Sequence, residues 1–151
     1  MPVCYVLIGL PGSGKTTWAN THFSNIARLS TDDYVERFAN KLQTTYSNCF
    51  KTVMPRAVRL MARKAKKVHK HQLDVVWDQT SLTELSRIRK FRMLPAHNMI
   101  AVVFSTPPDL LQRLASRPGK YISQTVLERM SSSYQEPSVS HGFSEIWRIT
   151  T

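Results

Sequence analysis

The chain has 151 residues, and 21 lysines and arginines against 10 aspartates and glutamates give it a net charge of +11. This length is enough for one domain with a single core, and no apolar run approaches the ~20 residues that a membrane helix needs. We therefore expect a single domain over residues 1–151, without a membrane span or a signal peptide and located in the cytoplasm. The excess of positive charge favours a polyanionic partner, which makes a nucleic acid the expected macromolecular partner.

The first motif, GLPGSGKT at positions 9–16, fits G-x-x-x-x-G-K-[ST] at every fixed position. It follows an apolar run at 3–8 that is typical of a strand buried on both faces, and a helix is expected from about residue 17. Loops of this kind direct backbone N–H groups at a phosphate, and the helix N-terminus adds about half a positive charge. The motif therefore predicts a site for ATP or another nucleoside triphosphate with Mg²⁺, and a turn that merely links strand to helix is the weaker interpretation.

Within this loop each residue type has an expected task. Lys15 would reach the outer phosphates, and the Thr16 hydroxyl would hold Mg²⁺. The residues expected to contact the phosphates are Gly12, Ser13, Gly14, Lys15, Thr16 and Thr17.

Four further apolar runs, at 26–29, 75–77, 99–104 and 146–149, predict strands that are separated by helical patterns. Strands that alternate with helices form a parallel sheet through right-handed crossovers, with helices on both faces. The sequence therefore predicts an α/β fold whose ligands bind at the carboxyl ends of the strands.

A long helix is expected at 55–72, beginning at Pro55 because a proline is tolerated in the first turn. Its apolar face would hold Val58, Met61, Ala65 and Val68, while lysines and arginines fill much of the remainder without acidic partners. Such charges repel one another, so they either face phosphates or are simply solvated, and the pattern leaves both interpretations open. A capping-box pattern at 81–84 predicts another basic helix through about Leu94, and shorter helices are expected at 109–115 and 126–134.

Three carboxylates follow predicted strands directly. Asp32 and Asp33 come after the second strand, and Asp78 ends the third, so all are expected at the edge of the sheet where the phosphate loop lies. A carboxylate at that edge can accept the proton of an attacking hydroxyl or help to hold a metal. The alternative is that these residues only cap the helices that follow.

Arg113 and Arg117 are one helical turn apart and precede the Pro118–Gly119 break, so they share a face close to a turn. This arrangement predicts a small lid that places cations over the triphosphate, with Lys120 nearby. A surface pair without function is the alternative interpretation.

GLPGSGKTTW, TDDY, WDQTSL and the R-x-x-x-R pattern, in this order, resemble the phage-type polynucleotide 5′-hydroxyl kinases over nearly the whole chain. The resemblance implies a P-loop kinase fold with five parallel strands in the order 2-3-1-4-5, and transfer of the γ-phosphate of ATP to the 5′-OH of DNA or RNA. It further implies that Asp32 is the general base and Asp78 an acceptor-side carboxylate, with Lys15 acting in catalysis. Arg113 and Arg117 become the lid arginines, and Arg117 would stabilise the transferred charge.

One position departs from that family. The arginine expected three residues after the catalytic aspartate, which grips the acceptor phosphate, is Val35 in this chain, and Arg37 is the nearest substitute. We therefore place Arg37 and Asp33 with Asp78 as candidate acceptor-binding residues. The alternatives are a kinase of a hydroxymethylated DNA base, a kinase of a small hydroxyl substrate such as a nucleoside, or an NTP-binding module without transfer.

Overall fold

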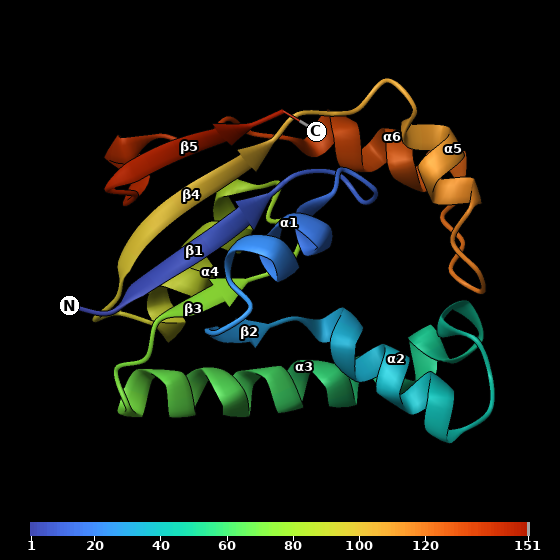
Figure 1. Ribbon diagram of the computed structural model, residues 1–151, viewed down its shortest axis with the longest axis horizontal. Helices are drawn as coiled ribbons and strands as arrows, with labels where there is room; N and C mark the ends of the chain where they lie inside the picture. The colour runs from blue at the N-terminus through green and yellow to red at the C-terminus, as the bar shows by residue number, and fades with distance from the viewer. Residues whose placement is uncertain (151) are drawn as a thin grey trace.

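The computed structural model, which describes residues 1–150, is built on a five-stranded parallel sheet with the order β2-β3-β1-β4-β5 and helices on both faces (Figure 1). The sequence-based fold class and strand order are thereby confirmed. The strands are β1 (Val3–Ile8), β2 (Ala27–Leu29), β3 (Val75–Trp77), β4 (Asn98–Phe104) and β5 (Glu145–Ile149).

The helices connect these strands and cover the sheet. They are α1 (Lys15–His22), α2 (Thr31–Lys41), α3 (Tyr46–Lys70), α4 (Glu84–Met93), α5 (Leu110–Ala115) and α6 (Gln124–Ser133), followed by a short 3₁₀ turn, η1 (Val139–His141). None of the described helices is both long and apolar enough to cross a bilayer.

The predicted start of the long helix is wrong. α3 begins at Tyr46, behind an N-cap at Thr45, and Pro55 lies inside it. The segment before the proline is helical because Cys49 and Val53 pack with Val35 of α2 in a separate apolar cluster, which compensates for the missing backbone donor. Val58, expected in the apolar stripe, is 46% exposed.

The predicted capping box at 81–84 is also wrong. Thr83 caps α4 by accepting from the N–H of Ser86, whereas Ser81 lies earlier in the loop with a φ of 47°. Two of the cations of α4, Arg87 and Lys90, are buried. The surface of α4 is therefore less basic than its sequence indicates.

The two faces of the sheet bury separate apolar clusters because successive strand residues point to opposite sides. Val6 and Ile8 of β1 pack with Met61 of α3 and Leu94 after α4 on one face. Leu7 packs with Ala19 of α1 on the other. The loops that follow the strands, together with α5 and α6, gather at the carboxyl end of the sheet, and the candidate site lies there (Figure 1).

Candidate functional site

The phosphate loop adopts the conformation that its sequence predicts. Gly12 and Gly14 have φ values of 81° and 91°, in the left-handed region that favours glycine, and Gly14 is the N-cap of α1. A Cβ atom on Gly12 would also meet the Leu110 and Leu114 side chains of α5 at 3.1 and 3.0 Å. The chain therefore requires glycine here both for the turn and for the close approach of α5.

Lys15 is folded back onto this loop. Its Nζ donates to the carbonyl oxygens of Gly9 at 2.9 Å and Leu10 at 2.7 Å, and the side chain is almost buried. Burial lowers the pKa of Lys15 to about 8, while the negative charges of Asp78 and Asp32 act in the opposite direction. The ammonium of Lys15 therefore lies beside the loop, where a negatively charged phosphate oxygen would be a stronger hydrogen-bond acceptor than the two carbonyl oxygens.

Asp78 is held against the end of the phosphate loop by Thr16. Its Oδ2 accepts a hydrogen bond from the Thr16 hydroxyl at 2.7 Å, and its backbone N–H donates to Leu29 O, which fixes the loop after β3. Burial raises the pKa of Asp78, opposed by the hydrogen bond from Thr16 and by the charge of Lys15.

The Thr16–Asp78 pair fits Mg²⁺. Within residues 1–150 no group of three or more histidines, cysteines, aspartates or glutamates could cage a metal. Mg²⁺ is commonly held by one or two protein oxygens, with phosphate oxygens and water completing its octahedron. Thr16 and Asp78 would supply those protein oxygens.

Asp32 lies in the first turn of α2, but it is not the cap. Ser30 is the N-cap and accepts from the N–H of Asp33, which leaves the Asp32 carboxylate available for other contacts. The Tyr46 hydroxyl donates to Asp32 Oδ1 at 2.5 Å, and Lys120 Nζ donates to Oδ2 at 3.2 Å. Tyr46 was missed by the sequence analysis, because nothing near Asp32 in the chain indicates that α3 begins beside it.

Asp33 has a different environment from Asp32. Arg28 of β2 binds both of its carboxylate oxygens, at 3.0 and 3.1 Å, and reaches Asn20 at 2.7 Å with its remaining nitrogen. Burial raises the pKa of Asp78, and the charge of Arg28 is one of those that oppose this effect, so Arg28 acts on both carboxylates. The sequence analysis did not single out Arg28, although it lies only two residues before the helix cap.

The two lid arginines are not equivalent. Arg117, just beyond α5, has two buried guanidinium nitrogens, Nε and Nη2, that have no partner among residues 1–150. Burial lowers the pKa of Arg117, and the negative charge of Asp32 opposes that effect, so the guanidinium lies within the field of this carboxylate. Arg113 instead binds Asp109 at 2.9 Å on a partly exposed surface.

The segment after Arg117 rests on α2 and α3. Gly119 O accepts from the N–H of Ser47 at 2.9 Å, and the Tyr121 N–H donates to Ser47 Oγ at 2.8 Å. Lys120 lies 4.4 Å from the centre of the Tyr46 ring and pairs with Glu36 at 3.4 Å as well as with Asp32. The segment after Arg117 thus places the Lys120 ammonium against the carboxylate of Asp32, the candidate base.

The acceptor-side substitute expected at Arg37 lies elsewhere. Arg37 is exposed, and its guanidinium lies over the Tyr34 ring at 5.3 Å. Val35 is fully buried between α2 and α3. Lys120 binds Asp32 and Arg28 binds Asp33, whereas Arg37 has no hydrogen bond or ion pair with either carboxylate among the described residues.

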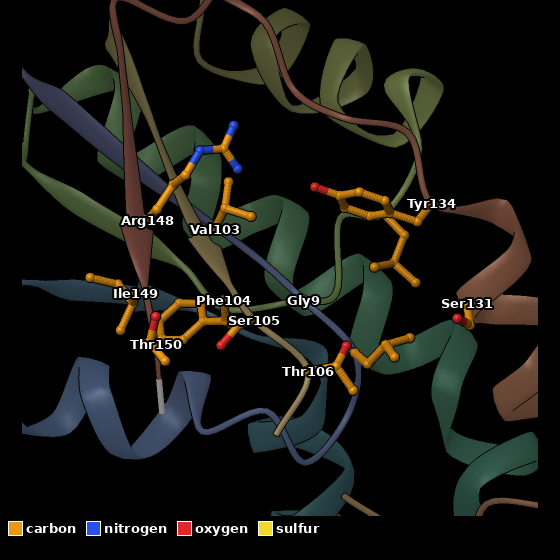
Figure 2. A pocket seen from close by; sticks show the side chains of 12 residues that line it. Gly9, Val103, Phe104, Ser105, Thr106, Ser131, Tyr134, Arg148, Ile149 and Thr150 are labelled. Atoms are coloured by element: carbon orange, nitrogen blue, oxygen red, sulfur yellow. The ribbon is translucent and has the colours of Figure 1, made fainter. Parts of the chain in front are cut away.

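A cavity of about 400 Å³ opens beside the start of the phosphate loop, at the carboxyl ends of β4 and β5 (Figure 2). Gly9 and Leu10 line it together with Phe104, Thr106 and Ile149. At its rim Tyr134 and Arg148 are directed toward each other, and both bind Glu136. No single motif marks this cavity, because its walls come from separate segments of the chain.

A family model described as an AAA domain matches residues 5–137, which is most of the chain. The chain belongs to this family, as a P-loop, kinase-like domain.

Solved structures show the same fold. A protein from Chloroflexus aurantiacus, provisionally named a kinase, superposes with a TM-score of 0.71 at 20% identity over 99% of this chain and 85% of that one. A chain of the Pnkp1/Rnl/Hen1 RNA repair complex gives 0.67 at 20% identity over 87% of this chain, but only 43% of its own length is covered. Shikimate kinase from Acinetobacter baumannii, in complex with shikimate, gives 0.59 at 18% identity over 100% and 86% of the two chains.

Proposed function

We propose that this protein transfers the γ-phosphate of ATP to a hydroxyl group of a nucleic acid, in the first place the 5′-OH end of DNA or RNA. The observation that carries the proposal is that Asp32, Lys15 and the unpartnered Arg117 guanidinium lie close enough for their charges to act on one another. A carboxylate can accept the proton of an attacking hydroxyl, and an unpaired guanidinium can bind the phosphoryl oxygens. A module that only binds nucleotide would not need both.

Each residue of the site has a task that its position allows. Bound ATP supplies the phosphoryl group, and Mg²⁺ neutralises part of its charge. Lys15 exchanges its two carbonyl partners for phosphate oxygens, and Thr16 and Asp78 hold the metal side. Arg117 stabilises the charge of the transferred group, because a planar guanidinium can contact two of its oxygens. Catalysis then depends mainly on positioning and charge neutralisation.

Asp32 receives the acceptor hydroxyl. In the structure its two oxygens are held by Tyr46 and Lys120, which orient the carboxylate before the acceptor arrives. A carboxylate oxygen has more than one lone pair, so the acceptor O–H can donate to Asp32 while Tyr46 remains bonded. Lys120 is the cation best placed to meet a phosphate of the acceptor, in the role that the sequence analysis assigned to Arg37.

The nucleic-acid substrate is supported by the distribution of charge. A triphosphate site needs only a few cations, whereas this chain carries a net charge of +11. α3 contains no acidic residue and exposes seven cations, which are Lys51, Arg56, Arg59, Arg63, Lys66, Lys67 and Lys70. The similarity to a chain of an RNA repair complex supports the same direction.

A small hydroxyl substrate is the second candidate, and one observation favours it. The position where the resembled family has its acceptor-gripping arginine holds the buried Val35, and Arg28 nearby is paired with Asp33. A substrate without a phosphate of its own would not require such an arginine. Similar folds occur in shikimate kinase and in a gluconokinase from Sinorhizobium meliloti, and both act on small molecules by name.

One assay separates the candidates. Transfer of radiolabelled γ-phosphate would be measured in parallel with 5′-OH single strands, 5′-OH duplex DNA, DNA with hydroxymethylated bases, nucleosides and small polyols. We expect the highest kcat/KM on 5′-OH oligonucleotides. Higher kcat/KM on nucleosides or polyols would replace the nucleic-acid proposal with the small-molecule one, and no transfer to any acceptor, with ATP bound, would leave only nucleotide binding.

A further inference from the structure

Lys90 is a buried cation that the site described above does not use. It lies on α4, is only 6% exposed, and among residues 1–150 its Nζ has one hydrogen-bond acceptor, Ser86 O, at 3.4 Å. Its other neighbour is the Trp77 ring, whose centre is 5.4 Å away. An ammonium group carries three donors and is unfavourable inside a protein unless they are satisfied. Burial lowers the pKa of Lys90 to about 8, so at neutral pH it is still mostly charged.

Ser81 is the second unsatisfied group in the same place. It is 3% exposed, its Oγ has no partner among the described residues, and its φ of 47° is rare for a residue other than glycine. Arg87 maintains this conformation, since Nε donates to Ser81 O at 2.8 Å and Nη2 to Leu82 O at 3.1 Å. These two hydrogen bonds fix the backbone at Ser81, and they therefore hold the Ser81 hydroxyl in one position.

Both groups line one cavity. A hollow of about 300 Å³ lies between the loop at 79–83, α4 and α6, and Lys90 and Ser81 are among its walls. The other polar walls are mostly hydroxyl-bearing, from Thr80, Thr83, Ser86 and Ser133, and no acidic side chain lines it. A cavity with a cation and several hydroxyls but without a carboxylate is suited to an anion with many acceptor oxygens.

We infer that this cavity binds a phosphate group through Lys90 and the hydroxyl-bearing residues of its walls. No residue of the phosphate loop lines it, so it is separate from the nucleotide site. The phosphate can come from two sources, a free inorganic phosphate ion or the backbone of a nucleic acid. The inference does not depend on the proposed transfer reaction.

The first test uses thermal unfolding of the full chain with the nucleotide site filled by MgADP. Added inorganic phosphate should raise the Tm of the wild type, because a ligand that binds only the folded state stabilises it. The rise should be absent in Lys90→Met and reduced in Ser81→Ala, and it should persist in Lys41→Gln, which removes an exposed lysine of α2. An equal rise in wild type and Lys90→Met would overturn the inference.

The second test measures binding on the wild type alone, and a variant serves only to assign the signal. The ¹H–¹³C signal of the Lys90 Cε methylene would be followed in the labelled wild type with MgADP present, and assigned with Lys90→Arg. We expect saturable movement of this signal on addition of inorganic phosphate, of a single-stranded oligonucleotide, or of both. Movement at far lower oligonucleotide than phosphate concentration identifies the backbone as the source, and movement with phosphate alone identifies the free ion. A signal that neither probe moves would overturn the inference, whatever the transfer assay shows.

Discussion

The hydroxyl of Tyr46 lies 2.5 Å from Asp32 Oδ1, across the junction between α2 and α3. Burial raises the pKa of Tyr46, and the neighbouring Asp32 charge and the hydrogen bond raise it further, so the phenol keeps its proton and remains a donor. Because Tyr46 is the first residue of α3, behind the Thr45 cap, its ring is fixed by the start of that helix. The orientation of the proposed base is thereby coupled to the packing of two helices.

Tyr46→Phe tests this coupling. The substitution keeps the ring beside Phe50 and Lys120 but removes one hydrogen bond to a carboxylate, a contact typically worth about 1.5–3 kcal/mol. If part of that orientation is needed in the transition state, kcat should fall about tenfold while KM for ATP stays nearly constant. Steady-state kinetics on the best acceptor would measure both. Tyr121→Phe, at an exposed tyrosine, is the matched control, and an unchanged kcat in Tyr46→Phe would leave Tyr46 a structural role only.

Asp32→Asn and Asp33→Asn should separate chemistry from folding. Asp32→Asn removes the base and should lower kcat by about 10²- to 10⁴-fold with little effect on ATP binding. Asp33→Asn weakens the ion pair with Arg28, so it should lower the Tm more than it lowers kcat. Transfer rates and thermal unfolding of both variants decide the matter. The assignment is off by one residue if Asp33→Asn loses transfer and Asp32→Asn keeps it.

The sequence predicts the parts of the fold that depend on local patterns. The run at 3–8 became β1 without a shift, and the phosphate loop has its glycines where positive φ values occur. The start of α3 was predicted wrongly at Pro55. The backbone hydrogen bond lost at this proline is offset by contacts between α3 and α2, which are distant in sequence and leave no local pattern. The predicted cap of α4 at Ser81 was also wrong, because the cap is Thr83, two residues further on.

The candidate site likewise has residues that a local motif predicts and residues that only the fold brings together. Lys15 and Thr16 belong to one motif, and the roles proposed for them follow from that motif alone. The contacts of Asp32 with Tyr46 and Lys120 span 14 and 88 positions, and only the fold brings those residues together. The exposed position of Arg37 likewise depends on which face of α2 packs against α3, which Val35 and Ala39 decide.

Arg117 and Arg113 provide a second matched pair. Arg117→Ala should depress kcat strongly with a smaller effect on ATP binding, because an unpartnered guanidinium gains its contacts when charge moves in the transition state. Arg117→Lys should restore only part of the rate, since a point charge cannot reproduce the planar fork. Arg113→Ala, which loses a surface pair with Asp109, should have a small effect. Comparable losses in both alanine variants would show that the lid acts through total charge.

We expect Lys90→Met to raise the free energy of unfolding, by an amount that depends on pH, in a buffer poor in multivalent anions. The pKa of Lys90 is lowered from 10.5 to about 8 in the folded state, so the unfolded chain binds more protons between these values. The cost of the buried ammonium is therefore fully present below pH 8 and disappears as the pH approaches 10.5. Lys90→Met should be more stable than wild type at pH 7, by about 3 kcal/mol at most, and the difference should shrink toward pH 10. A constant difference in urea unfolding between these pH values would contradict the assignment.

The exposed cations of α3 give the last prediction, which concerns the acceptor. If they follow a phosphate backbone, oligonucleotide affinity must fall steeply with salt, with a log–log slope of about −0.7 for each neutralised phosphate of a single strand. Four such contacts would give a slope of about −3. Replacing the exposed Lys66 and Lys67 with Gln should flatten the slope without changing turnover on a nucleoside, since a small acceptor releases no condensed counterions. Binding would be measured across a salt series for wild type and double variant, with Lys41→Gln on α2 as control. A flat dependence in the wild type would remove the nucleic acid from the proposal and leave a small hydroxyl compound as the substrate.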